Sequence, residues 1–292
     1  FCYTSQKEIT VFNRTYLSSP KLVQFLSNLD GSLTFNQLLD IHKLWLFENA
    51  NSLESVFSVQ FSKEEDHRNG HPAAFSFHMA RGWSDCYPEL QFFNDFPAGA
   101  RKDATFVTEI PNRGFAGGKI IDKTPPTKSW EVSERFHPMY KKYTISEDLT
   151  VVGRTMGYRP VELYRYAEVL LIYAEAKAAS GGVDASVLDA LNQVKRRAAG
   201  LDPNTPDASV DATSATISDI IAEKGWELAA EDKRWFDLIR TETLEEVAAR
   251  RDPTEKVPLM KQPTKAQYIT PLPAEAVSGS NLKQNPEGFQ PK

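Results

Sequence analysis

The sequence predicts a mainly α-helical protein, in which paired helices of an α/α superhelix follow an irregular region of loops and short β-strands. Before residue 157, apolar residues come in short pieces separated by turn-forming groups such as "NG", "PAGA", "PNRG" and "TPPT". Such groups interrupt long elements. After residue 157, apolar residues recur at steps of three and four, which is the period of a helix face. We therefore divide the chain into a loop-rich region, 1–157, and a helical region, 158–292.

The stretch "YRYAEVLLIYAEAKAASGG" predicts the first long helix of the helical region. "SGG" at 180–182 ends it, because glycine adopts the left-handed conformation of a helix C-terminus. The next helix begins at Asp184 or Ser186, and Gly200 and Pro203 stop it. The two helices should form an antiparallel hairpin. The face that we expect to be buried on the first helix consists of Leu163, Tyr166, Ala167, Leu170, Tyr173, Ala174 and Ala178.

A second helix pair is expected at about 217–230 and 232–249. In "KRWFDLIR", Trp235 is surrounded by apolar neighbours and is expected to be a buried anchor. Stacked hairpins usually need about three or more units to close a core. In the earlier region, the spacing predicts one helix over 32–47 and one strand over 55–62.

The composition excludes several classes of protein. The net charge is −5, and no basic cluster is longer than Lys195-Arg196-Arg197, so we expect no nucleic-acid partner. No run reaches the roughly 18 apolar residues of a membrane span, and residues 1–10 have no features of a secretory signal. Cys2 and Cys86 are compatible with one disulfide or with two free thiols.

Carboxylates recur along the predicted helices. Glu223, Glu227 and Glu231 form one stripe, and Glu168 and Glu175 lie seven residues apart. A di-iron site would also need Glu-x-x-His motifs, but the last histidine is His137, so we expect no metal and no cofactor. Instead, we expect these carboxylates to be scaffold groups paired with arginines, because a buried carboxylate needs a matching donor. The candidate arginines are Arg196, Arg197, Arg234 and Arg240.

Nothing in the sequence selects a catalytic centre. A glycosidase needs two carboxylates at a fixed separation, and the pairs Asp85 with Glu89 and Asp95 with Asp103 belong to no motif. The chain has no Gly-x-Ser-x-Gly, Walker or His-Glu-x-x-His sequence, so nucleophilic, nucleotide-dependent and zinc-protease chemistry are not indicated. We therefore expect a protein that is not an enzyme.

Aromatic residues concentrate between residues 75 and 96. They are Phe75, Phe77, Trp83, Tyr87, Phe92, Phe93 and Phe96. A sugar ring has an apolar face and a rim of hydroxyls, so its binder combines exposed aromatic rings with polar side chains. We predict that the phenylalanines plug the junction with the helices. The predicted ligand-binding residues are Trp83, Tyr87, His78, Arg81 and Asp85.

Three blocks of the sequence, in order, resemble the SusD/RagB family of surface glycan-binding lipoproteins. They are "RYAEVLLIYAEAKAASGGVDASVLDALNQVKRRAAGL" (165–201), "IIAEKGWELAAEDKRWFDLIR" (220–240) and "YITPLPAEAVSGSNLKQNPEGFQ" (268–290). Upstream, "NSLESVFSVQFS" and "RGWSDCYPELQFFNDFPAGARKDATF" resemble the strand and aromatic loop of this family. Asp232 stands where the family usually has glycine.

The resemblance implies tetratricopeptide-like hairpins and non-catalytic capture of an oligosaccharide or other nutrient. It also implies delivery to a SusC-like TonB-dependent transporter, and a location at the outer-membrane surface through an N-terminal lipid anchor that is not visible in this chain. The alternative hypothesis is a protein–protein interaction module that uses the helical hairpins and binds no glycan.

Overall fold

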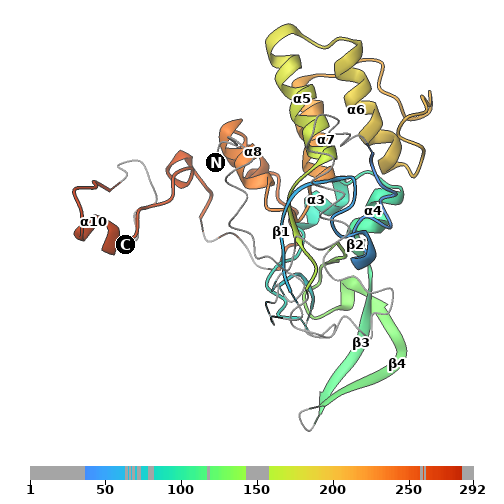
Figure 1. Cartoon of the computed structure of the whole chain (residues 1–292). Helices are drawn as coiled ribbons and strands as arrows, with labels where there is room; N and C mark the ends of the chain where they lie inside the picture. The colour runs from blue at the N-terminus through green and yellow to red at the C-terminus, as the bar shows by residue number, and fades with distance from the viewer. Residues whose placement is uncertain are drawn as a thin grey trace.

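The structure is a computed structural model that describes most of the chain after residue 36. The described residues are 37–62, 65, 67, 70, 74–77, 82–116, 119–142, 158–256, 259 and 261–284. Helices dominate the later half, as the sequence predicts, and the strands form short two-stranded sheets (Figure 1). No described helix has both the length and the hydrophobicity of a membrane span.

Among the described residues, the strands lie before residue 166 and the longest helices lie after it. The strands are β1 (Ser55–Val59), β2 (Phe106–Val107), β3 (Glu109–Ala116), β4 (Lys119–Ser129), β5 (Met139–Tyr140) and β6 (Val161–Arg165). The α-helices are α3 (Leu90–Asp95), α4 (Ala100–Thr105), α5 (Tyr166–Gly181), α6 (Ala185–Ala198), α7 (Ile217–Glu227), α8 (Arg234–Arg240), α9 (Leu244–Ala249) and α10 (Ala274–Ser278). The 3₁₀ turns are η3 (Phe47–Asn49), η5 (Trp130–Val132) and η6 (Lys265–Gln267).

The predicted hairpin of α5 and α6 is confirmed, and α7 packs beside it (Figure 1). Of the two start positions, Asp184 is the N-cap of α6, since its side chain accepts hydrogen bonds from the backbone of Ser186 and Val187. Gly182 follows α5 with φ of 82°, a conformation that favours glycine. The core between these helices consists of Ala167, Leu170, Leu171, Ala174, Ala178, Val187, Ala190, Leu191, Val194 and Ile220.

The second predicted helix of the next pair is broken. After α7 the chain turns through Ala230 and Asp232, whose φ values are 64° and 59°, and then forms α8 and α9 separately. Aspartate tolerates this left-handed conformation better than most residues. The turn aims Asp237 inward, with 2% of its surface exposed, and leaves Trp235 44% exposed. The expectation that Trp235 is a core anchor is therefore wrong.

The strands join distant parts of the chain. β1 pairs antiparallel with β6, so that Ser55 lies opposite Arg165, and β6 leads directly into α5. The strand expected at 55–62 is confirmed in its first five residues, whereas β6 replaces the expected first turn of the helix. Two residues expected on the buried helix face are exposed instead: Leu163 lies in β6 and is 37% exposed, and Tyr173 lies in α5 and is 45% exposed. The β3–β4 ribbon projects away from the helices (Figure 1).

The helix expected over 32–47 is wrong in its described part, because residues 41–45 form turns. Its apolar residues are nevertheless buried: Leu38, Ile41, Leu44 and Trp45 belong to the core. The expected plug of phenylalanines is confirmed for Phe75, Phe93 and Phe96, which are buried in clusters that include Ala229 or Ala230 of the helical region. Phe77 is buried against Ile110 and Met139 of the loop-rich region instead. Phe93 contacts Phe106 and Trp130 edge to face, with ring centroids 5.1 and 5.7 Å apart.

Removing the N-cap of α7 should weaken the fold by a small, measurable amount. The Thr216 side chain accepts from the Asp219 backbone, and the Asp219 side chain accepts from the Thr216 backbone in return. We expect Thr216→Ala to lower the free energy of unfolding by about 1 kcal/mol, measured by urea denaturation. Ser214→Ala, at an exposed position in the preceding loop, is the control. Equal stability of the two variants would contradict the capping role.

Candidate ligand-binding site

Two loops meet where the sequence predicts the ligand. One is the segment 82–89 that leads into α3, and the other is the segment 133–137 that follows η5. The Ser84 hydroxyl donates to the Glu134 carboxylate at 2.7 Å. The rings of Tyr87 and His137 lie 4.5 Å apart. The two loops therefore form one surface, although about fifty residues separate them in sequence.

Each loop exposes one large aromatic ring. Trp83 is 40% exposed and Phe136 is 42% exposed. The Trp83 ring lies against Gly70, where an added Cβ would be 3.6 Å from the indole. The Lys256 ammonium lies 5.0 Å from the centre of the Phe136 ring. Exposed rings beside charged groups suit a ligand with both apolar and hydroxyl-bearing surfaces.

The backbone has an uncommon conformation at Phe136 and at Ser84, the residue after Trp83. Ser84 has φ of 56° and Phe136 has φ of 57°. Positive φ is unusual for residues other than glycine and is a real outlier for a bulky side chain. Such residues persist only where the surroundings hold them, and they cluster at functional sites. Here Ser84 is held by its backbone N–H, which donates to the Ser76 carbonyl at 2.9 Å.

Two glutamates, Glu89 and Glu255, connect the start of α3 to the segment 252–255. The Glu89 carboxylate accepts from the backbone of Phe92 at 2.9 Å and of Asp252 at 3.0 Å. In return, the Glu255 carboxylate accepts from the Leu90 backbone at 3.0 Å. Glu255 also lies 2.9 Å from Nε2 of His137, the residue whose ring is next to that of Tyr87. Hydrogen bonds to Glu89 and Glu255 therefore hold both loops in place.

Of the predicted ligand-binding residues that the structure describes, two are exposed and one is half-buried. Trp83 and Asp85 are both exposed. Tyr87 is half-buried, and its ring packs against Phe77 with centroids 6.3 Å apart, so it supports the surface more than it forms it. His78 and Arg81 lie outside the described residues. Cys86 is exposed and has a free thiol, and Cys2 lies outside the described residues.

Sequence reasoning missed Phe136 and Lys256. Phe136 lies in "SERFHP", between Trp130 and Tyr140, a stretch with fewer aromatic residues than 75–96. Only the contact between the two loops places it beside the segment of Trp83.

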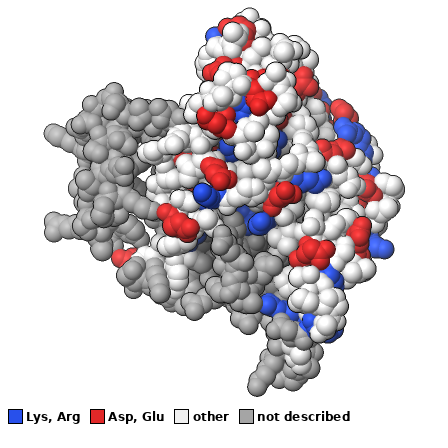
Figure 2. All heavy atoms as spheres, turned by 90° about the vertical axis from the view of Figure 1, so that its right-hand side faces the viewer, with Lys and Arg blue, Asp and Glu red and all other residues white. Residues whose placement is uncertain are grey.

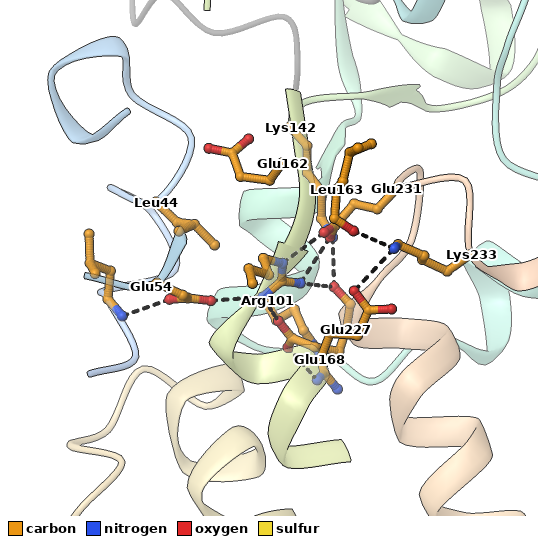
Figure 3. Close-up of polar contacts among 12 residues, drawn as sticks. Leu44, Glu54, Arg101, Lys142, Glu162, Leu163, Glu168, Glu227, Glu231 and Lys233 are labelled. Atoms are coloured by element: carbon orange, nitrogen blue, oxygen red, sulfur yellow. Dashed lines mark hydrogen bonds and ion pairs between the residues drawn. The ribbon is translucent and has the colours of Figure 1, made fainter. Parts of the chain in front are cut away.

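Four buried glutamates and four buried basic side chains form an ionic network between the loop-rich region and the helices. Its acids are Glu54, Glu223, Glu227 and Glu231, and its bases are Arg101, Lys142, Arg165 and Arg197, all of them at most 6% exposed. Figure 3 shows Glu54, Glu227 and Glu231 approaching the centre of this network from different parts of the chain. Glu54 and Arg101 come from the loop-rich region, and their partners Arg165, Arg197 and Glu227 come from the helical region. The network therefore joins the two regions.

Arg165, the last residue of β6, is at the centre of the network. Its guanidinium contacts Glu54 at 2.8 Å, Glu227 at 2.7 Å and Glu231 at 2.7 Å. Arg101, from α4, contacts Glu223 at 2.5 Å and Glu227 at 3.1 Å. Burial raises the pKa of Glu231, but Arg165 and Lys142 outweigh burial and hold that pKa below its usual value. Burial lowers the pKa of Lys142 to about 8, although Glu231 opposes the shift.

The predicted pairings with arginine are partly right. Arg197 bonds Glu227, and Arg240 bonds Glu175. Arg196 instead bonds Asp211 at 2.6 Å. Arg234 packs against Gly225. Glu168 is paired with a lysine, because Lys233 approaches its carboxylate to 3.2 Å and donates to the Leu163 carbonyl (Figure 3).

Over the described residues, no group of three or more His, Cys, Asp or Glu side chains is placed to hold a metal ion. On the face shown in Figure 2, acidic and basic side chains are interspersed over the described surface.

The described structure thus combines helical hairpins with an irregular region whose loops expose aromatic rings. The chain belongs to the SusD family, whose model matches residues 54–287. This match covers all six strands, the aromatic loop, the buried network and the helical hairpins.

The chain is similar to SusD-like protein P2 of Formosa agariphila, with 28% identity over 215 residues, which are 71% of this chain and 41% of that protein. Its fold is similar to surface glycan-binding protein A of Bacteroides uniformis, with a TM-score of 0.62, 21% identity, and coverage of 91% of this chain and 56% of that one. A similar structure, surface glycan-binding protein A of Bacteroides thetaiotaomicron in complex with laminarihexaose, gives a TM-score of 0.59 at 17% identity, covering 91% of this chain and 61% of that one. The chain thus spans about half the length of these relatives.

Proposed function

We propose that this protein binds an oligosaccharide at the bacterial cell surface without cleaving it, and hands it to a TonB-dependent outer-membrane transporter. The observation that carries the proposal is the pair of exposed rings, Trp83 and Phe136, on two loops that are fixed against each other. Membership of the SusD family supports the proposal, as does the laminarihexaose complex of a protein with the same fold. The outer-membrane location and a lipid anchor belong to the same proposal.

In each pair of carboxylates that the sequence offers for glycosidase chemistry, one carboxylate is held by other groups of the protein. Both oxygens of Glu89 accept backbone N–H groups, and Asp95 forms an ion pair with Arg250 at 3.1 Å. Each pair that the sequence offers for glycosidase chemistry therefore includes one carboxylate held by the fold. Retaining and inverting hydrolysis both require two carboxylates that face the scissile bond, so capture fits this surface better than cleavage.

Affinity electrophoresis tests the proposal. The protein is run through native gels that contain one soluble polysaccharide each, drawn from neutral, uronic and sulfated classes, and isothermal calorimetry with laminarihexaose supplies a defined oligosaccharide. We expect retardation in at least one gel, and no new reducing ends after prolonged incubation with the retarding polysaccharide. Failure to bind any member of a broad panel would contradict glycan capture, and new reducing ends would contradict the non-catalytic role.

A further inference from the structure

We propose that the glycan bound at this surface carries negatively charged groups, carboxylate or sulfate, and that Lys256 and Arg135 bind them beside the Phe136 ring. The inference rests on the proposed function and narrows its ligand from glycans in general to anionic glycans. Two cations carry it, because each lies against an aromatic ring of the site and neither has an acidic partner in the described part of the chain.

Lys256 is the first of these cations. It is exposed, and its ammonium lies 5.0 Å from the centre of the Phe136 ring, where attraction between a cation and an aromatic face favours it. The preceding residue, Glu255, is already paired, since its carboxylate contacts Arg251 at 3.2 Å and His137 at 2.9 Å. Among the residues that the structure describes, no carboxylate lies within ion-pair distance of the Lys256 ammonium. Its three donors are therefore available beside an exposed ring.

Arg135, in the same loop as Phe136, is the second cation. Its guanidinium lies 5.9 Å from the centre of the Tyr87 ring, and its Nε has no hydrogen-bond partner over the described ranges. The neighbouring acid, Glu134, is directed to the other loop, where its carboxylate accepts from the Ser84 hydroxyl at 2.7 Å. A guanidinium presents its donors in a rigid fork that matches a planar oxyanion such as carboxylate.

The charges of the two loops differ, which gives the bound glycan a direction. The loop of Trp83 carries the exposed acid Asp85, which accepts hydrogen bonds from sugar hydroxyls but repels an anion. The Phe136 side carries the two cations, whose hydrogen bonds to an anion are stronger than those to a hydroxyl. An anionic substituent at the Phe136 end, with hydroxyl groups toward Asp85, therefore fits this surface better than a neutral sugar.

Polysaccharides compared before and after removal of their charge test the proposal with the 292-residue chain. Polygalacturonate and other uronic polymers are compared with their methyl esters, and carrageenan and other sulfated polymers with their desulfated forms, by calorimetry. We expect at least one charged polymer to bind at least about tenfold more tightly than its uncharged form, because charge-assisted hydrogen bonds are lost. The treatment that weakens binding identifies the charged group as carboxylate or sulfate.

Substitution of Lys256 assigns the effect to this site. Lys256→Met removes the charge and keeps the length of the side chain. We expect it to weaken binding of the charged polymer at least about tenfold, to leave binding of the uncharged form within about twofold, and to keep the melting temperature. Lys256→Arg should restore binding of the charged polymer. Lys283→Met, the same change of charge at an exposed position after α10, is the matched control and should bind as wild type does.

The outcomes separate this inference from the proposed function. Glycan binding that is equally tight before and after removal of the charge would overturn the anionic class and leave glycan capture standing. Binding to no polymer of either kind would overturn both. Equal losses in Lys256→Met and Lys283→Met would show general attraction between charges instead of a site at Phe136, which also overturns the inference.

Discussion

Glu227→Gln should lower the free energy of unfolding by about 3–5 kcal/mol, a large part of the roughly 5–15 kcal/mol typical of a folded domain. The Glu227 carboxylate is fully buried and contacts Arg101, Arg165 and Arg197. Glutamine keeps the shape but removes the negative charge, so three buried guanidinium groups lose a shared counterion. Breaking a buried ion pair from one side is costly because the remaining charge stays in a medium of low dielectric constant.

Urea unfolding followed by circular dichroism measures this loss, with an unchanged m value as the sign that only stability has changed. Glu223→Gln removes a carboxylate that contacts Arg101 and should give an intermediate loss, which keeps the test informative if Glu227→Gln does not fold. Glu246→Gln, on the exposed side of α9, is the control and should change stability by less than about 0.5 kcal/mol. A loss below about 1 kcal/mol for Glu227→Gln would refute the structural role of the network.

The same network should make the folding stability depend on pH. Burial alone raises the pKa of Glu227, but Arg197, Arg165 and Arg101 outweigh it, so that its pKa in the folded protein is well below the usual value. Glu231 is shifted in the same direction. Their stabilisation is therefore fully present above the unfolded-state value of about 4.3, and it is lost as pH falls through the folded-state values. We expect wild-type stability to fall between about pH 5 and pH 3 more steeply than that of Glu227→Gln.

Trp83→Ala should weaken glycan binding at least tenfold, about 1.4 kcal/mol, without lowering the melting temperature. The indole is 40% exposed, so its removal deletes a stacking surface for the sugar and leaves the core packing intact. Truncation of an aromatic anchor at the centre of a binding surface typically costs more than about 2 kcal/mol. Calorimetry with the polysaccharide or oligosaccharide that binds wild type measures the change.

Tyr87 needs a different substitution, because its ring packs between Phe77 and His137. Tyr87→Ala would disturb both the fold and the ligand, whereas Tyr87→Phe keeps the ring and should bind within about threefold of wild type if the ring mainly supports the loop. Leu201→Ala, at an exposed position just after α6, is the control for Trp83→Ala. Undiminished binding by Trp83→Ala would show that the ligand lies elsewhere.

Local patterns in the sequence were sufficient for the first helical hairpin and for part of the proposed site. The α5–α6 hairpin could be predicted because its apolar period, its glycine turn and its Asp184 cap all act within a few residues. The phenylalanine plug and the exposed position of Trp83 also followed from local composition. The break between α7 and α8 could not be predicted from the sequence. It depends on left-handed backbone at Ala230 and Asp232, and neither residue is a glycine.

By itself, the sequence determined the class of fold, the first helical hairpin, the loop that carries Trp83, and the need for arginines to neutralise the helical acids. Only the tertiary structure decided which bases do so: Arg101, Lys142 and Arg165 lie 62 to 126 residues from Glu227 or Glu231 along the chain. It also decided that Phe136 lies beside the segment of Trp83, in the proposed binding surface, and that Trp235 is exposed. The physical reason is the same in each case, since local periodicity reports which side of an element is apolar, whereas charge pairing and the meeting of loops depend on contacts between segments far apart in sequence.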